Sequence, residues 1–126
     1  MAGRLVHFEL PAKDTARARE FYGSLFGWQF QSYGDMDYHL TQTDEQQGGA
    51  VNGMQEGEHA TIYFDVDDIE AALARVRELG GEADEKMPVP GMGWFAACKD
   101  PGGTNFSLWQ RDESAPMPEG MGSAPA

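Results

Sequence analysis

The fold is decided by VHFEL at residues 6–10 together with the apolar helical run that follows it at residues 16–26. The same pattern returns about 54 residues later, as ATIYF at residues 60–64 and a second helical run at residues 70–79. In both copies the first segment alternates polar and apolar side chains, which indicates a half-buried strand, and the second segment spaces its apolar residues as a helix does. The repeat therefore predicts two related modules in one chain.

Each copy continues with three short strands separated by polar or glycine-rich turns. In the first module, about residues 4–54, we expect these strands at residues 28–33, 36–43 and 50–54, and in the second, about residues 60–110, at residues 82–89, 93–99 and 104–110. The fold class is therefore α+β, with tandem βαβββ modules that form two curved sheets around a cleft. Clefts of this kind commonly bind small molecules.

A chain of 126 residues can bury one core but not two independent ones, so we expect residues 1–111 to form a single domain. Residues 112–126 are Pro, Gly, Ser, Ala, Met and acidic residues without periodicity, which predicts a disordered tail. Within the domain, Asp14 and Asp67 are suited to begin the two helices, and Gly27 is suited to end the first.

The charge of the chain excludes one class of partner. Nine basic residues against 21 acidic ones give a formal net charge of -12, the wrong sign for a nucleic-acid backbone or an anionic membrane surface. We therefore expect a small-molecule ligand, and neither nucleic acid nor membrane as a partner. Cys98 is the only cysteine, which excludes an internal disulfide, and no apolar run approaches the roughly 20 residues of a membrane span. Without an apolar signal segment at the amino terminus, a cytoplasmic location is expected.

Three short motifs occur in order along the chain: His7 in the first strand, FYGSLFGW at residues 21–28, and DPGG at residues 100–103. Together they resemble the vicinal oxygen chelate superfamily, the group of glyoxalase I, bleomycin-resistance proteins and extradiol dioxygenases. YFDVDD at residues 63–68 and FSLW at residues 106–109 are similar to a glyoxalase-like branch of that superfamily. The resemblance covers nearly all of the ordered chain. It implies a homodimer, because short two-module members of the superfamily commonly pair.

The resemblance also implies a divalent metal held on the inner face of the sheets, usually by His and Glu side chains. Carried over residue by residue, with the help of the repeat, its ligand positions fall on His7, Thr61, Ser107 and Gly53. Only His7 is a good ligand for zinc, nickel or iron, because hydroxyl groups bind these metals weakly and glycine has no side chain. We therefore expect the metal site to be lost, the glyoxalase activity with it, and no cofactor to be bound.

A rebuilt metal site stays open as an alternative, with a divalent ion as its cofactor. Glu9 lies on the same strand face as His7, and the fold could bring His39 or His59 close to them. These groups also have a plainer interpretation, in which His7 is a strand histidine bonded to a neighbour and the other two histidines are solvated.

The candidate ligand-binding residues are two polar anchors on the first strand and polar or aromatic side chains on later strands, all expected at the cleft. They are His7, Glu9, Tyr63, Trp94, Ser107 and Trp109. The aromatic rings among them could stack on a flat organic ligand, or they could fill a cleft that no longer binds anything. Other aromatic side chains are expected on the helix-covered faces and in the core, namely Phe8, Phe64, Phe106, Phe21, Tyr22 and Phe26.

Two classes of function follow from these residues. The first is a glyoxalase-like protein that binds a small organic molecule in the cleft without the family metal, in the manner of the bleomycin-resistance proteins. The second is an enzyme, either a lyase or dioxygenase with a rebuilt metal site or a catalyst of metal-free acid-base chemistry through His7 and Glu9. The sequence assigns no catalytic residue and names no ligand.

Overall fold

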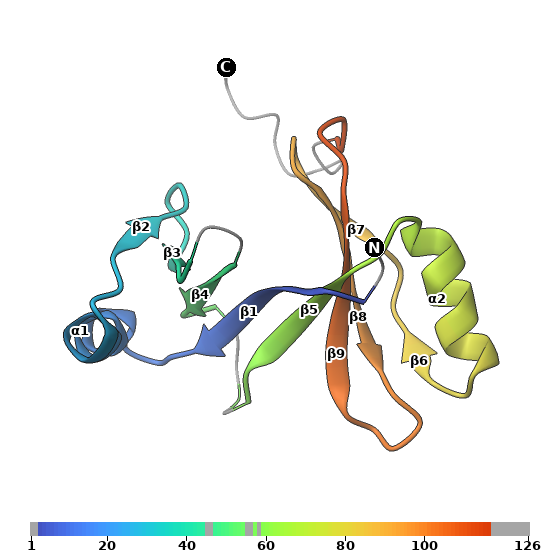
Figure 1. Cartoon of the computed structure of the whole chain (residues 1–126), viewed down its shortest axis with the longest axis horizontal. Coiled ribbons are helices and arrows are strands. Elements are labelled where there is room, and N and C mark those ends of the chain that lie inside the picture. The colour runs from blue at the N-terminus through green and yellow to red at the C-terminus, as the bar shows by residue number, and fades with distance from the viewer. Residues whose placement is uncertain (1–2, 45–46, 55–56, 58, 117–126) are drawn as a thin grey trace. The chain divides into compact units, whose positions relative to one another are not determined.

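The computed structural model describes residues 3–44, 47–54, 57 and 59–116 (Figure 1). Its elements, in chain order, are β1 (Leu5–Pro11), α1 (Thr15–Phe26), β2 (Phe30–Ser32), β3 (Tyr38–Gln42), β4 (Gly48–Asn52), β5 (Thr61–Asp65), α2 (Ile69–Glu78), β6 (Glu82–Ala83), β7 (Met87–Val89), β8 (Gly93–Lys99) and β9 (Asn105–Arg111). The order confirms the α+β fold and its repeated β-α-β-β-β arrangement. One predicted strand, at residues 82–89, is divided into β6 and β7. No helix in the described part of the chain has the length and apolarity needed to cross a membrane.

The chain forms two compact units that correspond to the two copies of the repeat. The N-terminal unit is Val6–Ile62, and the C-terminal unit is Tyr63–Ala126 together with Met1–Leu5. In the C-terminal unit the first residues of the chain pair with the end of β5, through hydrogen bonds from Gly3 N to Asp65 O and from Asp65 N to Arg4 O.

In the N-terminal unit the strands lie in the order β2-β3-β4-β1, with β1 parallel to β4 and the other neighbours antiparallel. Because successive side chains of a strand point to opposite faces, His7 and Glu9 share one face and Phe8 lies on the other. We call these the His7 face and the α1 face. On the α1 face, the Phe8 ring lies 5.9 Å from that of Trp28, just beyond α1. A Cβ at Gly49 would overlap the Phe8 ring, so this contact requires glycine.

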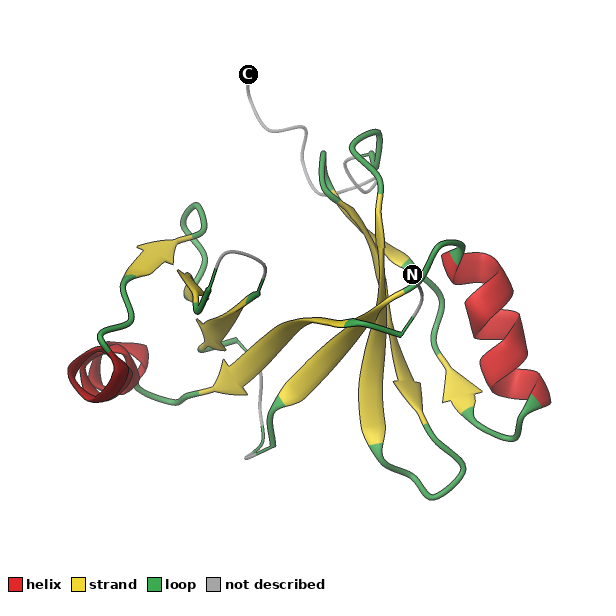
Figure 2. Ribbon diagram, viewed as in Figure 1, coloured by secondary structure: helices red, strands yellow, loops and turns green. Residues whose placement is uncertain are grey.

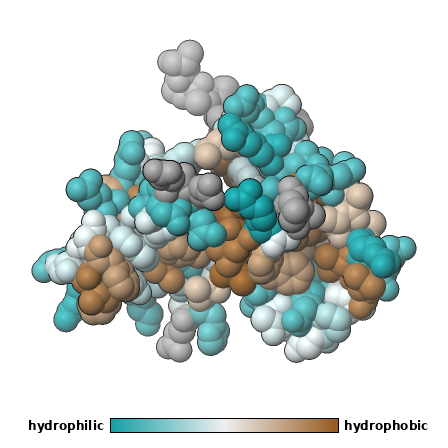
Figure 3. All heavy atoms as spheres, in the orientation of Figure 1, coloured by the Kyte–Doolittle hydropathy of each residue, from teal (hydrophilic) through white to brown (hydrophobic). Residues whose placement is uncertain are grey.

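Helix α1 begins and ends where the sequence predicts. The Asp14 side chain accepts a hydrogen bond from Arg17 N at 3.0 Å, and Gly27 follows the helix with φ 76°, a left-handed conformation that glycine adopts without strain. The prediction that Phe21 and Phe26 are core residues is wrong, since they are 59% and 56% exposed. In Figure 3 apolar surface gathers over α1, at the left of the view. Helical spacing defines an apolar face but does not specify what covers it.

A line of polar side chains ties α1 to the strands of its own unit. Thr15 Oγ1 donates to Asp37 Oδ1 at 2.6 Å, and the same oxygen lies 2.8 Å from His39 Nε2. The other ring nitrogen of His39, Nδ1, lies 2.9 Å from Ser32 Oγ. His39 is only 7% exposed, so its interpretation as a solvated histidine is wrong. Gly53 lies beside this line, where a Cβ would overlap the Asp37 carboxylate.

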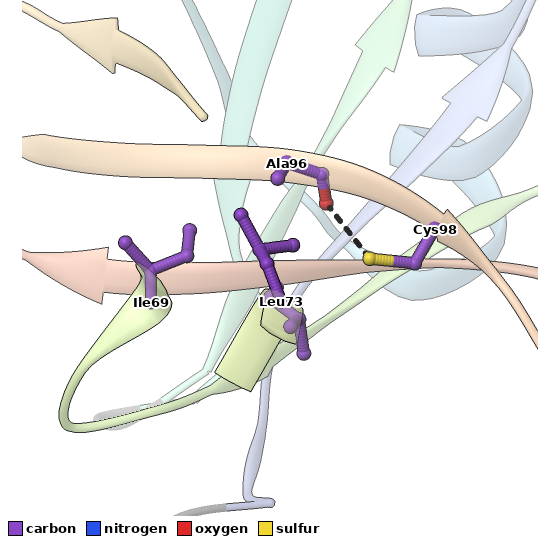
Figure 4. Packing of buried hydrophobic residues seen from close by; sticks show 5 residues of the cluster. Ile69, Leu73, Ala96 and Cys98 are labelled. Atoms are coloured by element: carbon purple, nitrogen blue, oxygen red, sulfur yellow. Dashed lines mark hydrogen bonds between the residues drawn. The ribbon is translucent and has the colours of Figure 1, made fainter. Parts of the chain in front are cut away.

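The C-terminal unit places α2 against a sheet in the order β5-β9-β8-β6, with β7 paired to β8 (Figure 2). Its core consists of side chains from α2, β8 and β9: Ile69, Leu73, Ala96, Cys98 and Leu108 (Figure 4). Cys98 is a small buried filler, as predicted, and its burial raises the pKa of the thiol. The helix is capped by Asp68, which accepts from Ala71 N at 3.1 Å, one residue later than the predicted Asp67.

The first residues of the predicted tail are part of the C-terminal unit, which corrects the start of that tail. Asp112 N donates to Met92 O at 2.8 Å, and Gly91 N donates to Ala115 O at 3.0 Å. Ala115 is 6% exposed. The composition of residues 112–116 does not reveal these contacts, because two backbone hydrogen bonds and one small buried side chain leave no periodic pattern in the sequence. Residues 117–126 lie outside the described part of the chain.

The contacts of Asp37 predict how the stability of the fold depends on acid. Hydrogen bonds from Thr15 and His39 hold the pKa of Asp37 below its ordinary value of 3.8. The ionised carboxylate therefore stabilises the folded chain above pH 3.8, and this contribution is lost as the pH falls from there through the lowered pKa. We expect the free energy of unfolding to fall less steeply with acid in Asp37→Asn than in the wild type, measured by urea titrations from pH 6 to pH 2.

Asp35→Asn is the matched control, because Asp35 is an exposed aspartate in the same β2–β3 turn. A wild-type acid slope retained by Asp37→Asn would contradict this account.

Candidate functional site

Three side chains on the His7 face form a relay of hydrogen bonds. The Tyr38 hydroxyl donates to Glu9 Oε2 at 2.6 Å and lies 2.7 Å from His7 Nε2. A tyrosine hydroxyl has one hydrogen, so once it donates to Glu9 it can only accept from the histidine. The relay therefore runs from the His7 Nε2–H to the Tyr38 oxygen and from the Tyr38 hydrogen to the Glu9 carboxylate. His7 Nδ1 is left as the acceptor nitrogen of the neutral ring.

The pairing of three strands brings these side chains together. Glu9 on β1 pairs with Ala50 on β4, and Ala50 pairs with Leu40 on β3. Tyr38 lies two residues before Leu40 and so shares its face. Tyr38 must reach over β4 to touch β1, and the small side chain of Ala50, which is 1% exposed, lies under that path. A large side chain on β4 would separate the hydroxyl from its two partners.

The relay is half-buried, and this determines the charge of the histidine. The side chains of His7 and Glu9 are 26% and 12% exposed, and His7 Nε2 lies 3.9 Å from Glu9 Oε2. Burial lowers the pKa of His7 from its ordinary value of 6.5, and the negative charge of Glu9 opposes that shift only in part. His7 is therefore uncharged at neutral pH, as the direction of the relay requires.

His7 also belongs to the wall of a hollow in the N-terminal unit. The hollow has a volume of about 870 Å³ and lies by the end of α1, strand β2 and the turn between β3 and β4. The residues that line it include Phe26, Trp28 and Phe30 and several glutamines, among them Gln31. A wall of rings, amides and a neutral histidine suits an uncharged organic molecule with polar substituents.

The residues at the inherited metal positions do not fit a metal. Thr61 and Ser107 offer only hydroxyl groups and Gly53 offers no side chain. At the remaining position, His7 Nε2 carries a hydrogen and donates it to Tyr38, so this nitrogen has no lone pair for an ion. In the described part of the chain, no three His, Cys, Asp or Glu side chains lie close enough together to hold a metal.

The other histidines do not complete a metal site around His7 either. His39 follows Tyr38 directly on β3 and therefore points to the α1 face, where its ring bonds Asp37 and Ser32. His59 lies exposed in the segment that precedes β5. Neither residue joins the relay, so the described residues give no support to a rebuilt metal site.

The C-terminal unit has its own candidate face. Tyr63 pairs with Ser107, and Ser107 pairs with Ala97 two residues after Phe95. Phe95 in turn pairs with Trp109, so the aromatic rings and the buried Ser107 share one face of the sheet. The Tyr63 and Phe95 rings touch edge to face, with centroids 6.4 Å apart. Phe95 was not among the residues predicted for this face.

Trp94 lies on the opposite face, and its predicted position beside Tyr63 and Trp109 is wrong. It packs against the core under α2, its Nε1 donates to Asp112 Oδ2 at 3.0 Å, and Lys86 Nζ lies 4.2 Å from the ring centroid. The strand itself was predicted correctly, but its phase was not, and a phase error of one residue exchanges the two faces.

Tyr38 belongs to the candidate site but was not predicted from the sequence. Its strand was predicted, but the segment DYHL at residues 37–40 drew attention to His39 as the more usual chemical group. The sequence does show by alternation that Tyr38 and His39 face opposite sides of their strand. Only the pairing of β3 with β4, and of β4 with β1, shows which of the two side chains contacts Glu9.

The sequence model of one protein family, the glyoxalase/bleomycin resistance protein/dioxygenase superfamily, matches residues 4–108 of this chain. The chain belongs to this superfamily. Among solved structures, a superfamily member from Vibrio splendidus 12B01 has a TM-score of 0.64 at 20% identity, covering 89% of this chain and 100% of that one. Homoprotocatechuate 2,3-dioxygenase from Brevibacterium fuscum has a TM-score of 0.68 at 23% identity, covering 92% of this chain and 38% of that one. At these identities the likeness shows the shared fold.

Two relatives are more similar in sequence. The anthracycline biosynthesis protein DnrV of Streptomyces peucetius is 31% identical over 125 residues, and the match covers 82% of this chain and 46% of the relative. A glyoxylase-like domain-containing protein of Didymella fabae is 33% identical over 90 residues, covering 64% of this chain and 70% of the relative. The chain thus spans less than half the length of the Streptomyces protein.

The relay predicts the effect of neutralising Glu9. Of the two causes acting on His7, burial lowers its pKa and only the Glu9 charge raises it. We therefore expect Glu9→Gln to lower the pKa of His7 further, measured by NMR titration of the ring protons with His59 as an internal reference. Glu20→Gln, which neutralises an exposed glutamate on α1, is the matched control. An unchanged or raised pKa of His7 in Glu9→Gln would show that Glu9 does not interact with the ring.

Proposed function

We propose that this glyoxalase-like protein binds a small organic molecule beside the relay of His7, Tyr38 and Glu9, without the family metal. The observation that carries the proposal is the Tyr38 hydroxyl, which bonds both His7 Nε2 and Glu9 Oε2. These groups are half-buried, and burying polar groups costs free energy unless they are paired. Their pairing gives a fixed set of donors and acceptors that can orient a ligand.

The hollow next to His7 supports a flat ligand with polar substituents. Gln31 pairs with Leu40 and so shares the face of His7, where its amide can bond hydroxyl or carbonyl groups of a ligand. Trp28 and Phe30, which belong to the α1 face, line the hollow as well. The wall contains no Lys, Arg, Asp or Glu side chain among the described residues, which favours an uncharged ligand. The similarity to an anthracycline biosynthesis protein agrees with a flat polycyclic ligand such as a hydroxyanthraquinone.

Metal-free acid-base catalysis is the second candidate function, and the same relay is the observation that favours it. A neutral His7 can accept a proton at Nδ1 while Tyr38 passes the Nε2 proton toward Glu9. A bound substrate with an acidic C–H or O–H group next to Nδ1 would then lose its proton without a metal. Binding without turnover and binding followed by proton transfer use the same three residues, so turnover separates the two functions.

Other expectations from the sequence stay predictions. These are a ligand site that joins Tyr63, Ser107 and Trp109 to His7 and Glu9, a homodimer, a cytoplasmic location, and no nucleic-acid or membrane partner. The exposed apolar side chains of α1, which include Phe21, Leu25 and Phe26, support a homodimer, since monomers rarely leave a large apolar patch uncovered.

Removing one oxygen atom tests the proposed binding site. We expect 1,8-dihydroxyanthraquinone to quench the tryptophan emission of the wild type, and Tyr38→Phe to weaken its binding by about 1 kcal/mol, or roughly fivefold, because the fixed relay is broken. Tyr33→Phe, which removes the hydroxyl of a tyrosine in the neighbouring turn, should bind the probe as the wild type does. Equal affinity of wild type and Tyr38→Phe would refute a role of the relay in binding.

A further inference from the structure

A second line of polar side chains lies on the α1 face, apart from the relay. Ser32 Oγ lies 2.9 Å from His39 Nδ1, and His39 Nε2 lies 2.8 Å from Asp37 Oδ1. An ionised carboxylate only accepts hydrogen bonds, so Nε2 carries a hydrogen, and in the neutral form of the ring Nδ1 accepts from the Ser32 hydroxyl. Hydroxyl, imidazole and carboxylate therefore follow one another in the order by which proteins activate a serine nucleophile.

The exposure of Ser32 and His39 matches these roles, while the Asp37 side chain is 51% exposed. Ser32 is exposed, whereas His39 is only 7% exposed. Water therefore does not compete for the hydrogen bonds that the His39 ring makes with Ser32 and Asp37. Asp37 is fixed by a further hydrogen bond from Thr15 Oγ1 at 2.6 Å to the same oxygen that faces His39. A base held on one side by a fixed carboxylate leaves its other nitrogen aimed at the nucleophile.

The edge of the sheet adds a donor for the reacting oxygen. β2 stands at the end of the strand order, beside β3 alone among the described strands. Ser32 is paired with His39, and the next pair outward is joined by a hydrogen bond from Tyr33 N to Tyr38 O. Hydrogen-bonded and non-bonded pairs alternate in an antiparallel ladder, so the Ser32 N–H points away from β3. It is placed to bond an oxyanion on a carbon attached to Ser32 Oγ.

We propose that Ser32 is an acyl-accepting nucleophile toward small uncharged esters, with His39 as its base and Asp37 as the positioning residue. Ser32 Oγ bonds to the carbonyl carbon while its hydrogen moves to His39 Nδ1. The bond from that carbon to the leaving oxygen then breaks, and the leaving alcohol takes the hydrogen from Nδ1. Water attacks the acyl-serine with the same proton transfers, releasing the acid and restoring Ser32. This site is separate from the relay, because Tyr38 and His39 are neighbours that face opposite sides of β3.

A fluorophosphonate probe tests the proposal on the full chain, since serine attack on phosphorus with loss of fluoride marks the nucleophile permanently. We expect mass spectrometry to find the probe on Ser32, and Ser32→Ala to lower the labelling rate at least tenfold. His39→Gln should lower it by roughly 10² to 10⁴, the usual contribution of a general base. Ser24→Ala, which removes an exposed hydroxyl from α1, should label as the wild type does.

The variant at the exposed Ser32 gives the clearer test, because replacing the buried His39 can also unfold the unit and lower labelling for that reason. Ser32→Ala should keep the wild-type melting temperature, and p-nitrophenyl acetate should acylate the wild type but not this variant. No label on Ser32, or equal labelling of wild type and Ser32→Ala, would overturn the proposal.

Discussion

The candidate site depends on the two hydrogen bonds of the Tyr38 hydroxyl group. The hydroxyl bonds His7 Nε2 at 2.7 Å and Glu9 Oε2 at 2.6 Å, and so joins the first strand of the sheet to β3. It also bridges an imidazole and a carboxylate that lie half-buried 3.9 Å apart, which is too far for a direct hydrogen bond between them. A metal binds and polarises substrate oxygens, whereas the relay offers hydrogen-bond donors and acceptors in a fixed arrangement.

Strand β3 contributes to two hydrogen-bond networks because its side chains alternate. Tyr38 belongs to the relay on the His7 face, and His39 belongs to the polar line with Asp37 and Ser32 on the α1 face. The small residue Ala50 on β4 lies between Leu40 and Glu9 on the face of Tyr38, while Gly53 leaves room for the Asp37 carboxylate. Two polar networks can therefore occupy one short strand without sharing a residue.

Much of the fold could be predicted from the sequence, because the periodicity of apolar residues and the helix caps depend only on residues close together in the chain. Residues Gly93–Lys99 form the predicted strand, and Asp14 and Gly27 bound the first helix as expected. The faces were harder to predict, since they depend on phase and pairing: Trp94 packs under α2, and Phe21 and Phe26 stay exposed. His7 and Glu9 were found by alternation along β1, but Tyr38 could be joined to them only through the register of three strands.

Metal binding by protein without a polyhistidine tag tests the central claim most directly. After dialysis against Zn²⁺ or Ni²⁺ and then against buffer, elemental analysis should find less than about 0.2 equivalents, since one histidine whose Nε2 is a donor makes a poor site. About one equivalent in the wild type, lost in His7→Ala, would show that the relay yields to a metal and would contradict the account.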